Sequence, residues 1–270
     1  MSFKKKLICI DMDGTLLTND NKITDKTKNY LRDLQTKGHY IVITSGRPYR
    51  AIKDYYNSIG LTTPVICGNG ANIVLPKSNK VLFSIKYPTE LIYKTLKEIG
   101  INNFENIMVE DDLNNLYMLN EGKSMDTFNY KDGMNVHYGD MTNKIEGTPT
   151  GVIFELKNSK YKAKMMKLCY SYSNIGLRFW ENSNFGELYF TSVNKHTAIC
   201  EVADLLGINK DNTICFGDAA NDIEMIDKAG IGVSMINGER SVKNYSSLCS
   251  LEDNNHDGVI ETLKLLLAAN

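Results

Sequence analysis

Strand-length apolar runs alternate with segments of helical spacing at both ends of the chain. Four such runs end in small or charged residues: 7–10, 39–44, 64–67 and 213–218. A short apolar run between turn residues is typical of a strand that is buried in a parallel sheet. Helical spacing predicts helices between the runs, at Thr24–Gly38, Pro48–Gly60 and Asn194–Gly207. The regular alternation predicts an α/β fold with a parallel core sheet.

The middle of the chain has a different pattern. Residues 151–157, with the sequence GVIFELK, alternate apolar and polar side chains, which is typical of a sheet with one face in solvent. Helical segments are expected at 89–100 and through 159–173. We therefore expect an α+β domain at 84–190, inserted into a core domain that is formed by 1–83 and 191–270.

Composition narrows the class of ligand. The 270 residues, 42% of them hydrophobic, are enough for a core domain and an insertion. The 31 Lys+Arg balance 32 Asp+Glu, so we expect no nucleic-acid partner and a small-molecule ligand instead. No apolar run has the length of a membrane span or a signal peptide, and the six cysteines lack C-x-x-C spacing. These features predict a cytoplasmic protein without a membrane partner, as a monomer or small homo-oligomer.

Chemically active residues gather where core strands end. These stretches are DMDGT at 11–15, TSGRP at 44–48, Asn194-Lys195, and GDAAND at 217–222. In open α/β sheets, ligands bind beyond the carboxyl ends of the strands. The first and last stretches would bring four carboxylates together, and such a cluster destabilises itself unless protons or a cation neutralise it. Oxygen ligands of this kind suit Mg²⁺, which also binds phosphate.

The same groups suit the transfer of a phosphoryl group. Asp11 is the candidate nucleophile, because a carboxylate can form an aspartyl-phosphate. Asp13, two residues further on, is the candidate general acid and later the general base. The phosphoryl oxygens would be contacted by the Ser45 hydroxyl, the Lys195 ammonium, and the backbone N–H groups of Met12 and Gly46.

Four ordered stretches resemble the motifs of the haloacid dehalogenase (HAD) superfamily. They are DMDGTLL (11–17), ITSGRP (43–48), Lys195 at the start of a helix, and FGDAANDIEMI (216–226). The chain is most similar to the Cof-type phosphatase branch, to which NGA (69–71) and HDGV (256–259) also point. The resemblance implies a Rossmann-like core with an inserted α+β cap that determines substrate specificity.

The resemblance also implies roles for individual residues. Asp11, the backbone carbonyl of Asp13, and Asp218 would bind Mg²⁺, and Asp222 would hold a metal-bound water. Asn221 would lie near the phosphate, with Ser45 and Lys195 on its oxygens.

Three further residues are candidates for substrate binding. Arg47 and Asn69 belong to the SGRP and NGA stretches. Glu187 follows the polar stretch 181–184 and is the cap residue that we expect to contact sugar hydroxyls. A solvated hairpin is the alternative interpretation of this part of the chain.

These observations predict a Mg²⁺-dependent phosphatase, a phosphoric monoester hydrolase, that acts on small phosphorylated metabolites, with sugar phosphates as the first expectation. One alternative is a phosphatase of nucleotide or cofactor phosphates such as flavin mononucleotide or pyridoxal phosphate. A phosphomutase is another. From a different class comes a sensor that binds phosphometabolites without turnover, although such a protein would need neither the nucleophile nor the acid.

Overall fold

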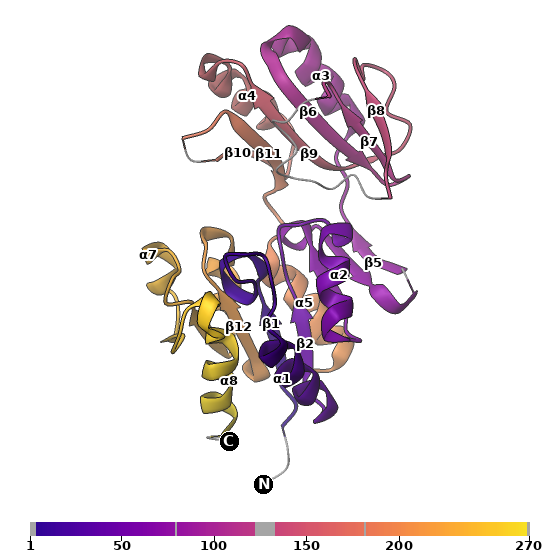
Figure 1. Ribbon diagram of the computed structural model, residues 1–270. Coiled ribbons are helices and arrows are strands. Elements are labelled where there is room, and N and C mark those ends of the chain that lie inside the picture. Colours follow the sequence, from indigo (N-terminus) through magenta and orange to yellow (C-terminus); the bar gives the residue numbers. More distant parts are fainter. Residues whose placement is uncertain (1–3, 79, 122–132, 181, 269–270) are drawn as a thin grey trace. The chain divides into compact units, whose positions relative to one another are not determined.

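The computed structural model describes residues 4–78, 80–121, 133–180 and 182–268 (Figure 1). The chain divides into two compact units. The core unit comprises residues 1–83 and 193–270, and the inserted unit comprises residues 84–192. Among the described residues, no helix combines the length and the apolar character that crossing a bilayer requires.

A five-stranded parallel sheet forms the centre of the core unit, with the strand order β14-β13-β12-β1-β2. The strands are β1 (Leu7–Ile10), β2 (Tyr40–Ile43), β12 (Thr213–Gly217), β13 (Ile231–Ser234) and β14 (Leu248–Cys249). All four residues of β1 are buried because both faces of the sheet are covered. This explains why the sequence of β1 is a continuous apolar run instead of an alternating one.

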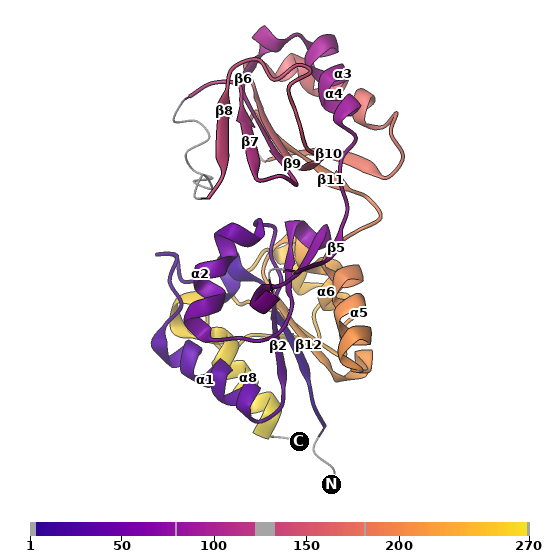
Figure 2. The same ribbon diagram turned by 90° about the vertical axis from the view of Figure 1, so that its right-hand side faces the viewer.

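Helices cover both faces of the core sheet (Figure 2). On one face, Ile8 and Ile10 pack in a cluster with residues of α1 (Asp25–Thr36), α2 (Tyr49–Ile59) and α8 (Gly258–Ala268). On the other face, Leu7 and Cys9 pack with residues from α5 (Lys195–Leu206), α6 (Ile223–Asp227) and α7 (Arg240–Lys243). The α/β fold with a parallel core sheet is therefore confirmed.

A small second sheet extends the core unit, with the order β3-β4-β5. Its strands are β3 (Val65–Cys67), β4 (Asn72–Leu75) and β5 (Lys80–Ser84). A parallel bridge between Thr44 and Ile66 joins β3 to the end of β2. The turn Gly68–Gly70, which connects β3 to β4, is thereby held beside the carboxyl end of the core sheet.

The inserted unit contains a six-stranded sheet in the order β10-β11-β9-β6-β7-β8. Its elements are α3 (Thr89–Ile99), β6 (Phe104–Asp111), β7 (Asn115–Met118), β8 (Asn135–Tyr138), β9 (Pro149–Leu156), α4 (Lys162–Cys169), β10 (Ile175–Phe179) and β11 (Phe185–Phe190). The helices α3 and α4 lie on one face (Figure 2), where Leu96 and Met165 line a small apolar space with Phe104 and Phe154. All strand pairs are antiparallel except β7–β8, so the sheet is mixed and the expected α+β insertion is confirmed.

Candidate active site

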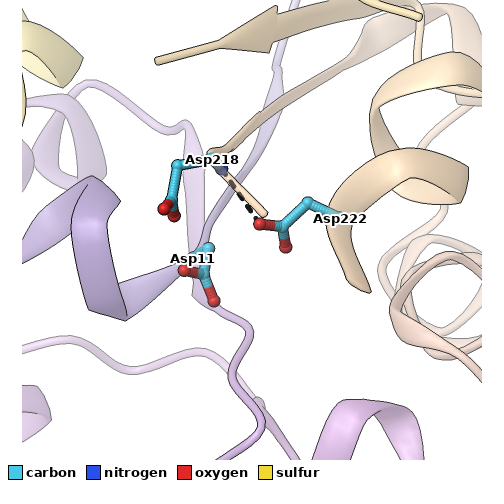
Figure 3. Close-up of side chains that lie close together, drawn as sticks. All are labelled: Asp11, Asp218 and Asp222. Atoms are coloured by element: carbon cyan, nitrogen blue, oxygen red, sulfur yellow. Dashed lines mark hydrogen bonds between the residues drawn. The ribbon is translucent and has the colours of Figure 1, made fainter. Parts of the chain in front are cut away.

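The carboxyl ends of β1 and β12 bring the first and last acidic stretches together. The two strands are neighbours in register, with Ile10 opposite Phe216, and the Asp11 amide donates to the Phe216 carbonyl at 3.0 Å. Asp11 and Asp218 therefore follow adjacent strands at the same edge of the sheet. Figure 3 shows the side chains of Asp11, Asp218 and Asp222 lying close together.

A tight turn after β1 shapes the site around Asp218. The turn Met12–Leu16 contains Gly14 at φ +73°, and a Cβ atom there would lie 2.3 Å from Oδ2 of Asp218. Glycine is required because it alone combines this backbone angle with the close approach. Thr15, the next residue, is buried and donates its hydroxyl to Oδ1 of Asp218 at 2.9 Å. The turn therefore fixes the orientation of a carboxylate that comes from the other end of the chain.

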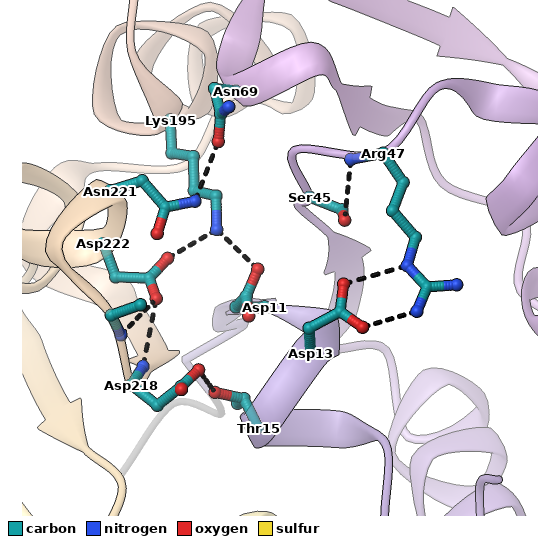
Figure 4. A network of polar contacts seen from close by, with 11 residues as sticks. Asp11, Asp13, Thr15, Ser45, Arg47, Asn69, Lys195, Asp218, Asn221 and Asp222 are labelled. Atoms are coloured by element: carbon teal, nitrogen blue, oxygen red, sulfur yellow. Dashed lines mark hydrogen bonds and ion pairs between the residues drawn. The ribbon is translucent and has the colours of Figure 1, made fainter. Parts of the chain in front are cut away.

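Lys195 enters the cluster from the first residue of α5. The side chain of Asn194 caps the helix by accepting from the Thr197 amide, and this determines where the helix begins. Gly70 allows the turn after β3 to pass close to the helix, because a Cβ atom there would lie 2.3 Å from the Asn194 carbonyl oxygen. The Lys195 side chain is fully buried, and its Nζ lies 2.5 Å from Oδ1 of Asp11 and 2.5 Å from Oδ1 of Asp222 (Figure 4).

The cluster contains three acidic side chains and one basic side chain. Burial and the nearby Asp222 raise the pKa of Asp11 well above its usual value, although Lys195 opposes this shift. Burial, together with Asp222, also raises the pKa of Asp218 to about 6. Burial alone would lower the pKa of Lys195, but Asp11 and Asp222 outweigh it and hold that pKa above its ordinary value. The ammonium is therefore charged, and one positive charge faces three carboxylates.

A divalent cation fits this arrangement. Asp11, Asp218 and Asp222 each offer a carboxylate oxygen, and the three oxygens lie within 4.8 Å of one another. Burial first, and the charge of Asp222 second, raise the pKa values of Asp11 and Asp218, and a bound cation would oppose both effects by favouring the ionised carboxylates. A donor set that consists of carboxylate oxygens favours a hard cation such as Mg²⁺.

Asp222 holds other groups in place with both of its oxygens. Oδ1 contacts Lys195, while Oδ2 accepts from the backbone amides of Asp218 and Ala219 at 3.0 and 3.1 Å. Gly217 allows this packing, since a Cβ atom there would lie 2.4 Å from Cγ of Asp222. Asp222 therefore orients both Lys195 and the loop that carries Asp218, and its expected role in holding a metal-bound water stays a prediction.

Ser45 and Arg47 follow β2, and Arg47 reaches Asp13. Ser45 is buried, and its hydroxyl accepts from the Arg47 amide at 3.1 Å. The Arg47 guanidinium binds both carboxylate oxygens of Asp13, with Nε at 2.9 Å from Oδ2 and Nη2 at 2.5 Å from Oδ1 (Figure 4). Asp13 thus points toward Arg47, whereas Asp11 points toward Lys195.

Two asparagines join the loops around the site. Asn69 has the left-handed backbone angle φ +55°, which asparagine tolerates better than most residues, and its Oδ1 accepts from Nδ2 of Asn221 at 2.8 Å. Gly46 lies beneath Asn69, because a Cβ atom at Gly46 would be 3.1 Å from Nδ2 of Asn69. The three loops that follow β2, β3 and β12 are therefore connected through these side chains.

The remaining predicted residues lie in two places. Met12 belongs to the turn after β1, and its side chain is buried in the apolar cluster of the core. Glu187 lies in β11 of the inserted unit and not in the polar loop before it, and it forms an ion pair with Arg178, which is opposite it in β10. Residue 181 of that polar loop lies outside the described residues.

Two residues with clear positions in the site were not assigned a role from the sequence. Thr15 donates to Asp218, as described above, and Nδ2 of Asn237 donates to the Gly14 carbonyl at 2.8 Å. The sequence contained a signal for Thr15, because a hydroxyl directly after a glycine and before two buried leucines must find a partner. Asn237 lies 223 residues from Gly14 in the chain, so no local pattern connects them.

Comparison with known proteins shows similarity over nearly the whole chain, and not only at the sequence motifs. The model of the family described as haloacid dehalogenase-like hydrolase matches residues 8–263. The chain belongs to the haloacid dehalogenase-like hydrolases. The same family of HAD phosphatases includes the 5-amino-6-(5-phospho-D-ribitylamino)uracil phosphatase of Bacillus subtilis, which is 30% identical to this chain over 98% of both chains. This HAD protein is therefore a phosphatase of the Cof-type, subclass IIB group.

Solved structures share the fold. A haloacid dehalogenase-like hydrolase from Bacteroides thetaiotaomicron matches 97% of this chain and all of its own, with a TM-score of 0.85 and 23% identity. A sugar phosphatase of HAD subclass IIB matches 97% of this chain and 99% of its own, with a TM-score of 0.78 and 19% identity. These similarities show the HAD IIB fold, with its parallel core sheet and inserted mixed-sheet cap.

Proposed function

We propose that this HAD phosphatase is a Mg²⁺-dependent hydrolase of phosphate monoesters on sugars or sugar alcohols, and that the reaction passes through an aspartyl-phosphate on Asp11. The observation that carries the proposal is the contact of Asp11 with the buried Lys195, beside Asp218 and Asp222. A nucleophilic carboxylate acts in its ionised form, and Lys195 favours that form of Asp11 against burial and Asp222, which raise its pKa.

In the first step, an oxygen of Asp11 attacks the phosphorus atom of the substrate. The bond from phosphorus to the leaving oxygen breaks, and that oxygen takes a proton from the carboxyl group of Asp13. The ammonium of Lys195 and the hydroxyl of Ser45 stabilise the negative charge on the three other phosphoryl oxygens. The backbone amides of Met12 and Gly46 serve the same purpose, and Asn221 orients this side of the pocket through Asn69.

In the second step, water replaces the substrate's leaving group. The Asp13 carboxylate removes a proton from the water molecule as its oxygen attacks phosphorus, and the bond between phosphorus and Asp11 breaks. Inorganic phosphate leaves, Asp11 is a carboxylate again, and Asp13 holds the proton needed for the next turnover. Asp11 and Asp13 are both unchanged after one cycle, so the two carboxylates account for both steps.

Asp11 and Asp218, with the backbone carbonyl of Asp13, are the residues that would hold Mg²⁺ in this proposal. When bound, the cation supplies positive charge that neutralises the carboxylates and the phosphate. Two neighbouring residues orient the groups of this site: Asp222 accepts from Lys195, and Thr15 donates to Asp218.

The substrate class rests on the relatives. The Bacillus subtilis phosphatase at 30% identity is named for a substrate with a phosphorylated D-ribityl chain, which is a reduced sugar. A solved structure of the same fold is named a sugar phosphatase. Phosphate esters on sugar or polyol chains are therefore the first substrates to test, and the cofactor phosphate flavin mononucleotide, which also carries a ribityl phosphate, is the second.

The test is a phosphate-release assay on a panel of substrates. It compares sugar 5- and 6-phosphates, the ribitylaminouracil phosphate, flavin mononucleotide, pyridoxal phosphate, nucleotides and p-nitrophenyl phosphate, with Mg²⁺ or with a chelator. We expect release that requires Mg²⁺, that is fastest on sugar or ribityl phosphates, and that is absent from the Asp11→Asn variant.

Other outcomes would favour the alternatives. Isomerisation of a sugar phosphate without release of phosphate would indicate a mutase. Binding that raises the melting temperature, with neither release nor isomerisation, would indicate a sensor. Preference for nucleotides or pyridoxal phosphate would keep the phosphatase mechanism and overturn the proposed substrate class.

A further inference from the structure

We infer that Arg47 is a positioning residue for Asp13 and not a ligand of the substrate. The inference rests on the proposed function, in which Asp13 is the general acid and base. The motif that contains Arg47 made it a candidate for substrate binding, but its guanidinium is already directed at a carboxylate of the same site.

The contact between the two side chains is bidentate. Nε and Nη2 of Arg47 each bind a different oxygen of Asp13, at 2.9 and 2.5 Å. The planar guanidinium fork matches the planar carboxylate, so this pair fixes the direction as well as the position of the ionised Asp13 side chain, the form that acts as the base in the second step. Lysine cannot reproduce this because its ammonium is a point charge.

The pair is too exposed for stability to be its main effect. The Asp13 side chain is 57% exposed, and exposed ion pairs contribute little to folding because water screens them. An exposed aspartate without a partner would rotate among several conformers. The geometry therefore points to orientation as the purpose of the pair.

Arg47 is itself fixed by several groups of the core unit. Its amide donates to Ser45 Oγ, and its carbonyl oxygen accepts from the Gly68 amide at 3.1 Å. Its guanidinium carbon lies 5.8 Å from the centre of the Tyr55 ring, which is within the range of a cation–π contact. Tyr55 in turn donates its hydroxyl to the Asn21 carbonyl at 3.0 Å. The position of Asp13 is thus determined by α2 and by the loop after β2.

The two carboxylates of the first motif are held by different cations. Asp11 contacts the fully buried Lys195, and Asp13 contacts Arg47, whose side chain is 19% exposed (Figure 4). The separation keeps the nucleophile and the proton-transferring group apart, although only Met12 lies between them in sequence. Lys195 and Ser45 are then the side chains that we propose contact the phosphate.

The test is a double-mutant cycle with Arg47→Ala and Asp13→Ala. The substrate is p-nitrophenyl phosphate with Mg²⁺, for which the second step still requires a base at position 13. If Arg47 acts through Asp13, Arg47→Ala lowers kcat about 100-fold, the loss expected for a misplaced reacting group. In the Asp13→Ala background the same change alters kcat by less than about 2-fold, because nothing is left to orient.

Binding measurements separate orientation from substrate contact. We expect Arg47→Ala to leave the inhibition constant of inorganic phosphate unchanged and not to raise KM, because slower hydrolysis of the aspartyl-phosphate lowers KM together with kcat. Arg47→Lys keeps the charge but loses the fork, so we expect kcat to stay low; this variant also covers the case in which Arg47→Ala fails to fold. Lys37→Ala, which removes an exposed ion pair with Asp33 on α1, is the control for loss of one positive charge.

The opposite results would overturn the inference. These are a rise in KM and in the phosphate inhibition constant, losses in kcat that multiply in the double variant, or recovery by Arg47→Lys. They would assign Arg47 to the substrate's phosphate. A different result would refute the proposed function itself, namely turnover by Asp11→Asn. An inactive Asp11→Asn together with a fully active Arg47→Ala would refute only the role of Arg47.

Discussion

The ammonium of Lys195 lies 2.5 Å from Oδ1 of Asp11, although 184 residues separate them in the chain. Both side chains are almost completely buried, and Asp222 holds the other side of the same ammonium. A buried pair of this kind is costly to desolvate and is weak evidence for stability in itself. Its position at the carboxyl end of β1 is consistent with the proposed chemistry.

Removal of this ammonium should destabilise the core unit. Lys195→Met keeps the length of the side chain but leaves Asp11 and Asp222 buried without their cation. We expect the free energy of unfolding to fall by about 3 kcal/mol and turnover to be lost. Urea denaturation with and without Mg²⁺ measures the effect, with Lys37→Met as the exposed control. An unchanged denaturation midpoint would show that the contact with Lys195 does not compensate the two carboxylates.

Gly14 should be essential because a side chain at this position would clash with Asp218, and a second glycine allows this clash to be separated from backbone strain. Gly14→Ala places a Cβ atom against Asp218 at a positive φ, so we expect loss of Mg²⁺-dependent activity. Gly207, at φ +65°, has nothing within 4 Å of an added Cβ, and it is therefore a matched control for backbone strain. Gly207→Ala should cost about 1 kcal/mol of stability and keep activity. Equal activity of the two variants would contradict the proposed role of the turn.

Thr15 should affect the metal site through Asp218. Thr15→Val keeps the shape of the side chain and removes the hydroxyl that orients Oδ1 of Asp218. We expect the apparent affinity for Mg²⁺ to fall about 10-fold, as is usual when a group behind a metal ligand is lost. The dependence of the melting temperature on Mg²⁺ concentration gives this affinity without an activity assay. The same half-saturating concentration in both proteins would refute the prediction, and Thr36→Val, on the exposed side of α1, is the control.

Asp257 should contribute stability that depends on pH. Burial pushes its pKa upward, but hydrogen bonds from Thr24 and Thr27 and the nearby Lys26 outweigh burial and hold the pKa below the ordinary 3.8. Because the pKa is lower in the folded state, the stabilisation is complete at pH values above the ordinary pKa and is lost as the pH falls below it. Asp257→Asn should therefore destabilise the protein at neutral pH, and the difference from the unchanged protein should shrink in acid.

The Asp257→Asn variant removes the negative charge of the carboxylate and keeps the size of the side chain. Asp257 has φ +59°, which asparagine also tolerates, so the backbone should not change. Unfolding free energies measured from pH 7 to pH 2 decide the question, with Asp20→Asn at an exposed position as the control. A difference that stays constant over this range would show that the ionised carboxylate is not the source of the stability.

Local sequence patterns predicted the parallel core, because each apolar run and each helix cap acts over a few residues. Thr24, where the first helix was expected to begin, caps α1 through the Thr27 amide, and α5 begins one residue after Asn194. The pairing of side chains could not be predicted in the same way. The contact of Arg47 with Asp13 depends on the geometry of two loops, and no spacing rule distinguishes it from a contact with substrate.

In the inserted unit, too, local patterns predicted single elements but not how distant segments pair. Alternation in residues 151–157 predicted β9, but the parallel pair β7–β8 follows from how the chain returns after β7, which periodicity does not encode. Glu187 was expected directly after the polar stretch 181–184, as a residue that contacts sugar hydroxyls, and that role stays a prediction. Its position in β11, opposite Arg178, is fixed by strand register.

The most direct test of the central proposal is to trap the phosphoryl group on the protein. A ³²P-labelled substrate of the panel is mixed with excess enzyme and Mg²⁺ and quenched in acid during the first turnover, and the labelled peptide is then identified. We expect label on Asp11, none in Asp11→Asn, and a longer-lived label in Asp13→Asn, because the second step lacks its base. Release of phosphate by Asp11→Asn, or label on another residue, would contradict it.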